Sequence, residues 1–107
     1  MTQKNTLRPA TQEDYRKHAQ KELKNALSYA SHELIIDVDT AVYGEDMAVY
    51  VTVTSEAVTS ISSGNRPVMY NSHIETVRKM GYDFVCVSAG EEGITAFFSK
   101  DVLGGAL

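Results

Sequence analysis

The sequence predicts an α+β fold, a two-layer sandwich in which a four-stranded antiparallel sheet carries helices on one face. The first observation is an internal repeat, because a helix-like stretch is followed by two strand-like stretches twice, giving the order α-β-β-α-β-β. The second is the likeness of the turns, Gly44-Glu45-Asp46 and Gly90-Glu91-Glu92-Gly93. Because one helix with one hairpin cannot bury its own apolar face, we expect the two modules to share a single core.

The first helix is expected to follow a loose N-terminal arm, residues 1–10, which contains Pro9 and few apolar groups. Thr11 has the character of an N-cap, with Asp14 in the capping-box position, and the helix should end near Ser31-His32. Apolar residues recur at steps of three and four and define one buried stripe. They are Tyr15, Ala19, Leu23, Ala26, Leu27 and Ala30.

A hairpin is predicted next, because the apolar period changes from helical to two after residue 33. One set of alternating positions should face the core, namely Leu34, Ile36, Val38, Thr40 and Val42 before the turn and Met47, Val49, Val51 and Val53 after it. Residues 55–67 form a connector rich in Ser, Thr, Gly and Asn, and a variant of the fold with a short extra helix here is also consistent with the sequence.

The second helix is expected to begin at Ser72, which forms a capping-box pattern with Glu75, and to end at Gly81 in a left-handed conformation. The run from Tyr82 to Ser88 is almost continuously apolar, which predicts a strand covered on both faces, in a central position of the sheet. Cys86 should then be a buried structural residue. A last strand follows the second turn, so that residues 11–103 form one domain and 104–107 a frayed tail.

Several function classes lack their usual sequence signals. The chain of 107 residues has one cysteine, so it forms no internal disulfide, and its three histidines are far apart, so neither a metal nor another cofactor is expected. It has no phosphate-cradling glycine loop, no apolar run of membrane-spanning length and no secretory signal, and we expect a cytoplasmic protein. No histidine stands beside a nucleophile, and no catalytic residue is assigned.

Charge is divided unevenly along the chain, which has a net charge of −4. Residues 1–32 hold six Lys or Arg and three Asp or Glu, whereas the rest hold four and eleven. Asp37 and Asp39 lie two apart on one strand and therefore share a face of the sheet. Together with the acidic turns and a connector that carries Arg66, they define the residues expected to bind a partner. These are Asp37, Asp39, Tyr43, Glu45, Asp46, Tyr50, Arg66, Glu91 and Glu92.

This pattern favours a small acidic protein-binding module over an enzyme. We expect it to act as an inhibitor or adaptor that docks on a protein such as nucleic-acid-handling machinery, in the manner of small accessory proteins of phages and mobile elements. One alternative is a small-molecule-binding domain or enzyme with a pocket between sheet and helices, near His73, Tyr70 and Asp39. Another is nucleic-acid binding through the basic first helix, although its interleaved acidic residues disfavour this. A homodimer through an edge strand or the helix layer is left open.

Overall fold

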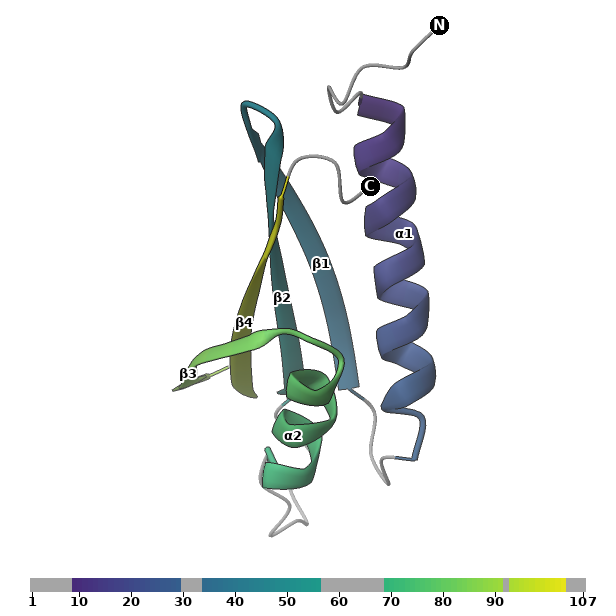
Figure 1. Cartoon of the computed structure of the whole chain (residues 1–107). Coiled ribbons are helices and arrows are strands. Elements are labelled where there is room, and N and C mark those ends of the chain that lie inside the picture. Colours follow the sequence, from purple (N-terminus) through teal and green to yellow (C-terminus); the bar gives the residue numbers. More distant parts are fainter. Residues whose placement is uncertain (1–8, 30–33, 57–68, 92, 104–107) are drawn as a thin grey trace, which may run out of the picture.

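The protein is an α+β domain with the predicted order of elements, as seen in a computed structural model (Figure 1). The structure describes residues 9–29, 34–56, 69–91 and 93–103. The four strands form one antiparallel sheet in the order β1-β2-β4-β3, and helix α1 packs on it. The elements are α1 (Pro9–Ala26), β1 (Leu34–Tyr43), β2 (Asp46–Glu56), α2 (Asn71–Lys79), β3 (Asp83–Gly90) and β4 (Gly93–Val102).

Helix α1 begins earlier and ends earlier than the sequence pattern indicated. It starts at Pro9, which suits a first helical position because proline lacks only an N–H that has no partner there. The prediction of Thr11 as N-cap is therefore wrong, since Thr11 lies inside the helix. At the other end the Ser28 hydroxyl donates to the carbonyl of Asn25 at 2.8 Å, and the helix gives way to a turn that extends to Tyr29. The arm was predicted over residues 1–10, which is wrong for residues 9–10 because they belong to α1; residues 1–8 and the predicted tail 104–107 lie outside the described residues.

The first hairpin is confirmed, but Val42, which was predicted to face the core, is 39% exposed. Val38 pairs with Val51 and Ile36 with Val53, and all four are buried. The turn uses Gly44 with φ of +62°, a left-handed conformation that costs glycine little. The buried strand residues meet the stripe of α1, and Val77 of α2 joins the same cluster. The core consists of Ala19, Leu23, Leu27, Ile36, Val38, Met47, Val49, Val51, Val53, Val77, Tyr82, Ala96, Phe98 and Val102.

Helix α2 has the predicted C-terminus but not the predicted N-terminus. Its N-cap is Tyr70, which makes no side-chain capping hydrogen bond, so the predicted capping box is wrong. Glu75 instead binds the guanidinium of Arg78 at 2.9 Å, one turn further along. Gly81 has φ of +101° and its N–H donates to the carbonyl of Arg78 at 2.9 Å, as a left-handed helix terminus requires.

Strand β3 contradicts the prediction of a central, covered strand. It lies at the edge of the sheet, and every residue from Asp83 to Gly90 is exposed, Cys86 included. The reason is that β4 pairs with both β2 and β3, so β4 takes the inner place and β3 keeps one neighbour. Cys86 is therefore not the buried structural residue that the apolar run suggested.

The other edge strand, β1, is closed by α1. The Gln12 side-chain amide donates to the carbonyl of Thr40 at 3.2 Å, and that of Gln20 donates to the carbonyl of Ile36 at 2.9 Å. The two contacts are spaced alike on the helix and on the strand. The eight residues from Gln12 to Gln20 rise about 12 Å, and the four residues from Ile36 to Thr40 rise about 13 Å. Helix α1 thus runs antiparallel to β1 and satisfies backbone acceptors on its edge. Within the described ranges, no helix is long and apolar enough to cross a membrane.

We expect Gln20→Ala to lower the free energy of unfolding by about 1 kcal/mol, because the carbonyl of Ile36 loses its donor. Gln20→Glu removes the same donor but keeps an acceptor for Arg16, which donates to the Gln20 Oε1 atom at 3.3 Å, so it separates the two contacts of this side chain. Urea denaturation measures both, with Lys21→Ala, at the neighbouring exposed position, as the control. Equal stability of Gln20→Ala and Lys21→Ala would contradict a role for this contact.

Candidate functional site: the outer face of the sheet

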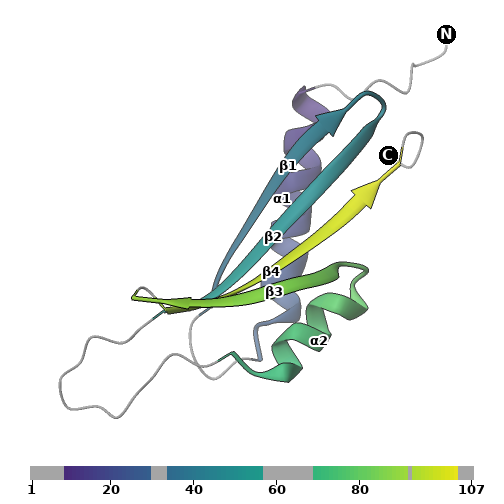
Figure 2. The same ribbon diagram turned by 90° about the vertical axis from the view of Figure 1, so that its left-hand side faces the viewer.

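The helices contribute to the core from one side of the sheet, which leaves the opposite side, here called the outer face, bare. Figure 2 looks onto this side, with α1 behind the strands. Side chains alternate along each strand, so residues between the buried positions point outward. Asp37, Asp39 and Tyr43 of β1 and Tyr50 of β2 do so and are exposed. The sequence prediction that these four share one face is consistent with the observed register.

The register of the sheet adds two carboxylates that the sequence prediction missed. Asp39 is level with Tyr50, Tyr50 with Ser99, and Ser99 with Asp83, so one row crosses all four strands. Asp101 lies two residues from Ser99 on the same face of β4. Neighbouring strands are about 5 Å apart and alternate residues about 7 Å apart, which sets the spacing of these groups.

All charged strand residues on the outer face are acidic within the described part of the chain. Five aspartates lie there: Asp37, Asp39, Asp46, Asp83 and Asp101. The strands' basic residue, Lys100, turns to the helix side, where its Nζ atom lies 5.2 Å from the centre of the Tyr82 ring. The outer face therefore presents one sign of charge, which focuses an attractive field on cationic partners.

The negative charges of the outer face also act on helix α1, which lies at the β1 edge. Arg16 is bound by Glu13 at 2.6 Å, and this hydrogen bond is the main cause that raises the pKa of the Arg16 guanidinium. The charges of Asp39 and Asp37 raise it further. The basic surface of α1 is correspondingly reduced, because Glu13 neutralises Arg16. This arrangement weakens the case for nucleic-acid binding through α1.

Two tyrosines lie beside the carboxylates of the first hairpin. A hydrogen bond with Tyr43 is the largest cause that raises the pKa of Tyr50, and the charge of Asp101 contributes as well. Both phenols are exposed, at 62% for Tyr43 and 44% for Tyr50. A tyrosine offers a large contact surface and a polar hydroxyl at a low cost in side-chain entropy, which makes this pair suited to anchor a protein partner.

The two acidic turns do not converge. Met47 pairs with Val102 and Glu56 with Gly93, so the turn at Gly44 and the turn at Gly90 lie at opposite ends of the sheet. Glu45 and Asp46 therefore extend the outer face at one end, whereas Glu91 is exposed at the other end. Two of the residues predicted to bind a partner, Arg66 and Glu92, lie outside the described residues.

The outward carboxylates are too far apart to form an ion site. Among the described residues, no group of three or more His, Cys, Asp or Glu could hold a metal ion. The pocket considered near His73, Tyr70 and Asp39 does not assemble, because Asp39 lies on the outer face while His73 is buried on the helix side. There its ring packs against Tyr29 and Tyr70 at centroid distances of 5.7 and 5.4 Å. That histidine is part of the contact between α2 and the end of α1.

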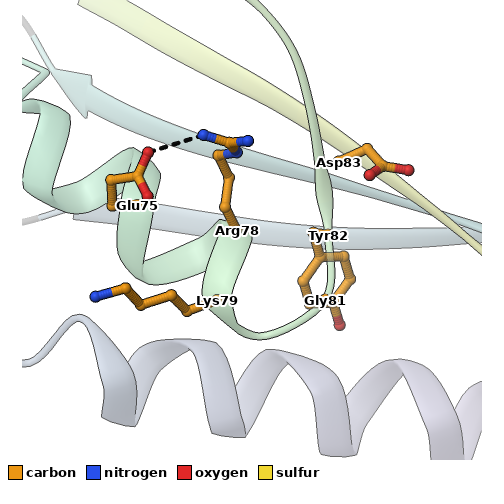
Figure 3. Close-up of a pocket in the computed structure, with 6 residues that line it drawn as sticks. All are labelled: Glu75, Arg78, Lys79, Gly81, Tyr82 and Asp83. Carbon is orange, nitrogen blue, oxygen red and sulfur yellow. Dashed lines mark hydrogen bonds and ion pairs between the residues drawn. The ribbon is translucent and has the colours of Figure 1, made fainter.

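A hollow of about 340 Å³ lies where α2 passes into β3 (Figure 3). Its charges are mixed, and Arg78 is already bound to Glu75. It is open to solvent and mainly polar, whereas small-molecule sites are concave and mainly apolar. The lining residues are Glu75, Arg78, Lys79, Gly81, Tyr82 and Asp83.

Comparison of the chain with protein-family models, with curated proteins and with solved structures finds no match. The function is therefore inferred from the geometry of the molecule. The feature with the most consistent chemistry is the outer face, which combines five aspartates with the Tyr43–Tyr50 pair on a hydrogen-bonded sheet.

The phenol of Tyr82, one of the residues that line the hollow, provides a test of burial at this end of the sheet. Burial raises the pKa of its phenol from 10.0 to about 12, and Tyr15 and Glu22 add to the effect. An unfolded chain would release this proton near pH 10.0, whereas the folded chain holds it to about 12. The stabilisation by the neutral phenol is thus complete below pH 10.0 and is lost as the pH rises toward 12.

We therefore expect the unfolding free energy of the wild type to fall in this alkaline range by an amount of the order of 2 kcal/mol more than that of Tyr82→Phe. Urea denaturation at a series of pH values measures the difference. Absorbance titration of phenolate should show that the substitution removes the tyrosine that ionises last. If the two proteins lose stability in parallel, Tyr82 is not buried as described.

Proposed function

We propose that this protein acts by docking its outer face on a basic surface of another protein, as an inhibitor or adaptor. The observation that supports the proposal is the single sign of charge on that face, where Asp37, Asp39, Asp83 and Asp101 have no Lys or Arg among the described strand residues beside them. A random surface of a protein with ten basic side chains would mix the two signs. The basic residues in the described part of the chain lie elsewhere, either on the two helices or on the helix side of β4.

The sheet also fixes the carboxylates in space before binding. Each aspartate projects from a strand that is paired along its length, so the pattern of charges needs little reordering on contact. A rigid set of negative charges has an effect on Lys and Arg similar to that of nucleic-acid phosphates. The partner class that fits this chemistry is a protein with an exposed nucleic-acid-binding surface.

The Tyr43–Tyr50 pair would supply contact area that charge alone does not. Charged groups mainly steer association and select partners, whereas buried aromatic anchors dominate the stability of many complexes. The pair stands on the hairpin next to Asp39 and Asp101. In this arrangement the carboxylates would set the orientation and the two phenols would be covered.

The test is a charge reversal of exposed outer-face residues, Asp37→Lys, Asp39→Lys and Asp101→Lys in one chain. A matched control reverses three exposed acids of the helices, Asp14→Lys, Glu22→Lys and Glu75→Lys, and has the same net charge. We expect the outer-face variant to bind a partner at least tenfold more weakly, a loss of at least about 1.4 kcal/mol, and the control to bind nearly as the wild type.

The measurement begins with quantitative capture from cell extract by the wild type and both variants, followed by titration of the captured protein at several salt concentrations. The wild type should lose affinity as salt increases, and its partner should lose binding to duplex DNA or RNA in competition. Circular dichroism and a denaturation curve confirm that each variant is folded. Partners retained equally by all three proteins would reject the outer face as the docking surface.

A further inference from the structure

The two edges of the sheet differ in a way that the proposed function does not explain. The β1 edge is closed by Gln12 and Gln20 of α1, which donate to its carbonyl groups. The β3 edge is open, since no described side chain hydrogen-bonds to the backbone of β3 and every residue of the strand is exposed. Natural edge strands are commonly guarded by charge, proline, a covering segment or a β-bulge, and β3 has an irregularity of the last kind between Phe84 and Cys86. Here the edge strand has one charged residue, Asp83, at its first position.

Strand β3 also exposes large apolar side chains, although Asp83 and Ser88 lie on its outer side. Phe84 packs against Phe98 at 5.7 Å yet remains 40% exposed, and Val85 and Val87 are 58% and 44% exposed. An irregularity in the pairing between Phe84 and Cys86 leaves Val85 out of register with β4. A partner for this strand must therefore satisfy backbone groups in the plane of the sheet and cover apolar side chains above and below it.

We propose that β3 pairs with β3 of a second copy of this chain, antiparallel about a two-fold axis near Cys86 and Val87, to form a continuous eight-stranded sheet. An isologous contact of this kind requires a self-complementary surface, which β3 provides. Its first half carries the large residues Phe84 and Val85, and its second half the small residues Ser88, Ala89 and Gly90. Antiparallel pairing places the large half of one copy beside the small half of the other.

The charges at the two ends of β3 are complementary in one antiparallel register, although Asp83 is acidic and Arg78 is already bound to Glu75. Before the strand stand Arg78 and Lys79 at the end of α2, and the Lys100 Nζ atom lies 3.6 Å from the position of a Cβ on Gly81. After the strand stands Glu91, which is exposed. In the register centred on Cys86, Glu91 of each copy comes opposite Gly81 of the other, beside Lys100 and the hollow between α2 and β3 (Figure 3). In the register centred on Val87 it would come opposite Asp83, a like charge, so the register on Cys86 is favoured. Parallel pairing would place like charges together.

The axis passes close to the only cysteine of the chain, which supplies a direct test. Strand spacings place the two Cys86 Cα atoms about 5 to 8 Å apart in either register that centres on Cys86 or Val87. A short bis-maleimide, which joins two thiols by thioether bonds, should therefore link the wild-type chain into a covalent dimer with high yield. Sedimentation equilibrium should give the mass of two chains, and amide protons of β3 should exchange more slowly as concentration increases.

The disrupting variant is Val87→Lys, and the matched control is Val42→Lys, at a valine of β1 with similar exposure, 39% against 44%. We expect Val87→Lys to weaken dimerisation at least tenfold and to abolish most of the cross-link, while Val42→Lys keeps both. Val85→Lys, at the most exposed valine of the strand, is a second disrupting variant in case the first is poorly folded.

A monomeric mass at all concentrations would overturn the proposal. An extended segment of a different protein would then be the remaining candidate partner of β3. A dimer that survives both disrupting variants, or that forms no Cys86 cross-link, would place the interface elsewhere and equally overturn it. Open-ended growth beyond two copies would show pairing that does not close about a two-fold axis. None of these results bears on the outer-face charge reversal, because that variant leaves β3 unchanged.

Discussion

The packing of α1 along β1 is the contact on which the rest of the architecture depends. Leu23 and Ala19 of the helix enter the core from above the sheet, while Gln12 and Gln20 reach the carbonyl groups of the strand. Apolar burial supplies most of the stabilisation, but it has no direction along the helix axis. The two glutamine contacts do have direction, and they form only with α1 antiparallel to β1 and placed at this edge of the sheet.

Because α1 lies at the β1 edge, the two edges of the sheet are covered unequally. A helix at the β1 edge protects that edge and buries the helix side of β1 and β2, whereas α2 is a nine-residue helix joined to the end of α1 through Tyr29 and Thr76. Of its buried residues, His73 lies in that junction and Val77 lies in the core. The helices therefore leave β3 exposed, and the order β1-β2-β4-β3 puts an apolar strand where no helix shields it.

The alternation of residues 34–54 was enough to predict the first hairpin, because its inward and outward positions differ clearly in polarity. The same reasoning failed for β3, where a continuous apolar run describes a covered central strand and a bare edge strand equally well. Asp83 and Asp101 could not be assigned to the outer face either, since their positions follow from the pairing of two hairpins that are distant in sequence. The capping box of α2 failed because the helix already begins at Asn71 with Tyr70 as its N-cap, which places Ser72 inside the helix.

The outer face and the β3 edge belong to one sheet but use different parts of it. Docking through the aspartates and tyrosines uses side chains that project at right angles to the sheet, whereas pairing through β3 uses backbone groups in its plane. A two-fold axis perpendicular to the sheet keeps the outer faces of both copies on the same side. Pairing would therefore not cover Asp37, Asp39 or Asp101 but would place a second set of them beside the first. Two such sets on one rigid surface would increase the avidity for a partner that itself presents repeated basic sites.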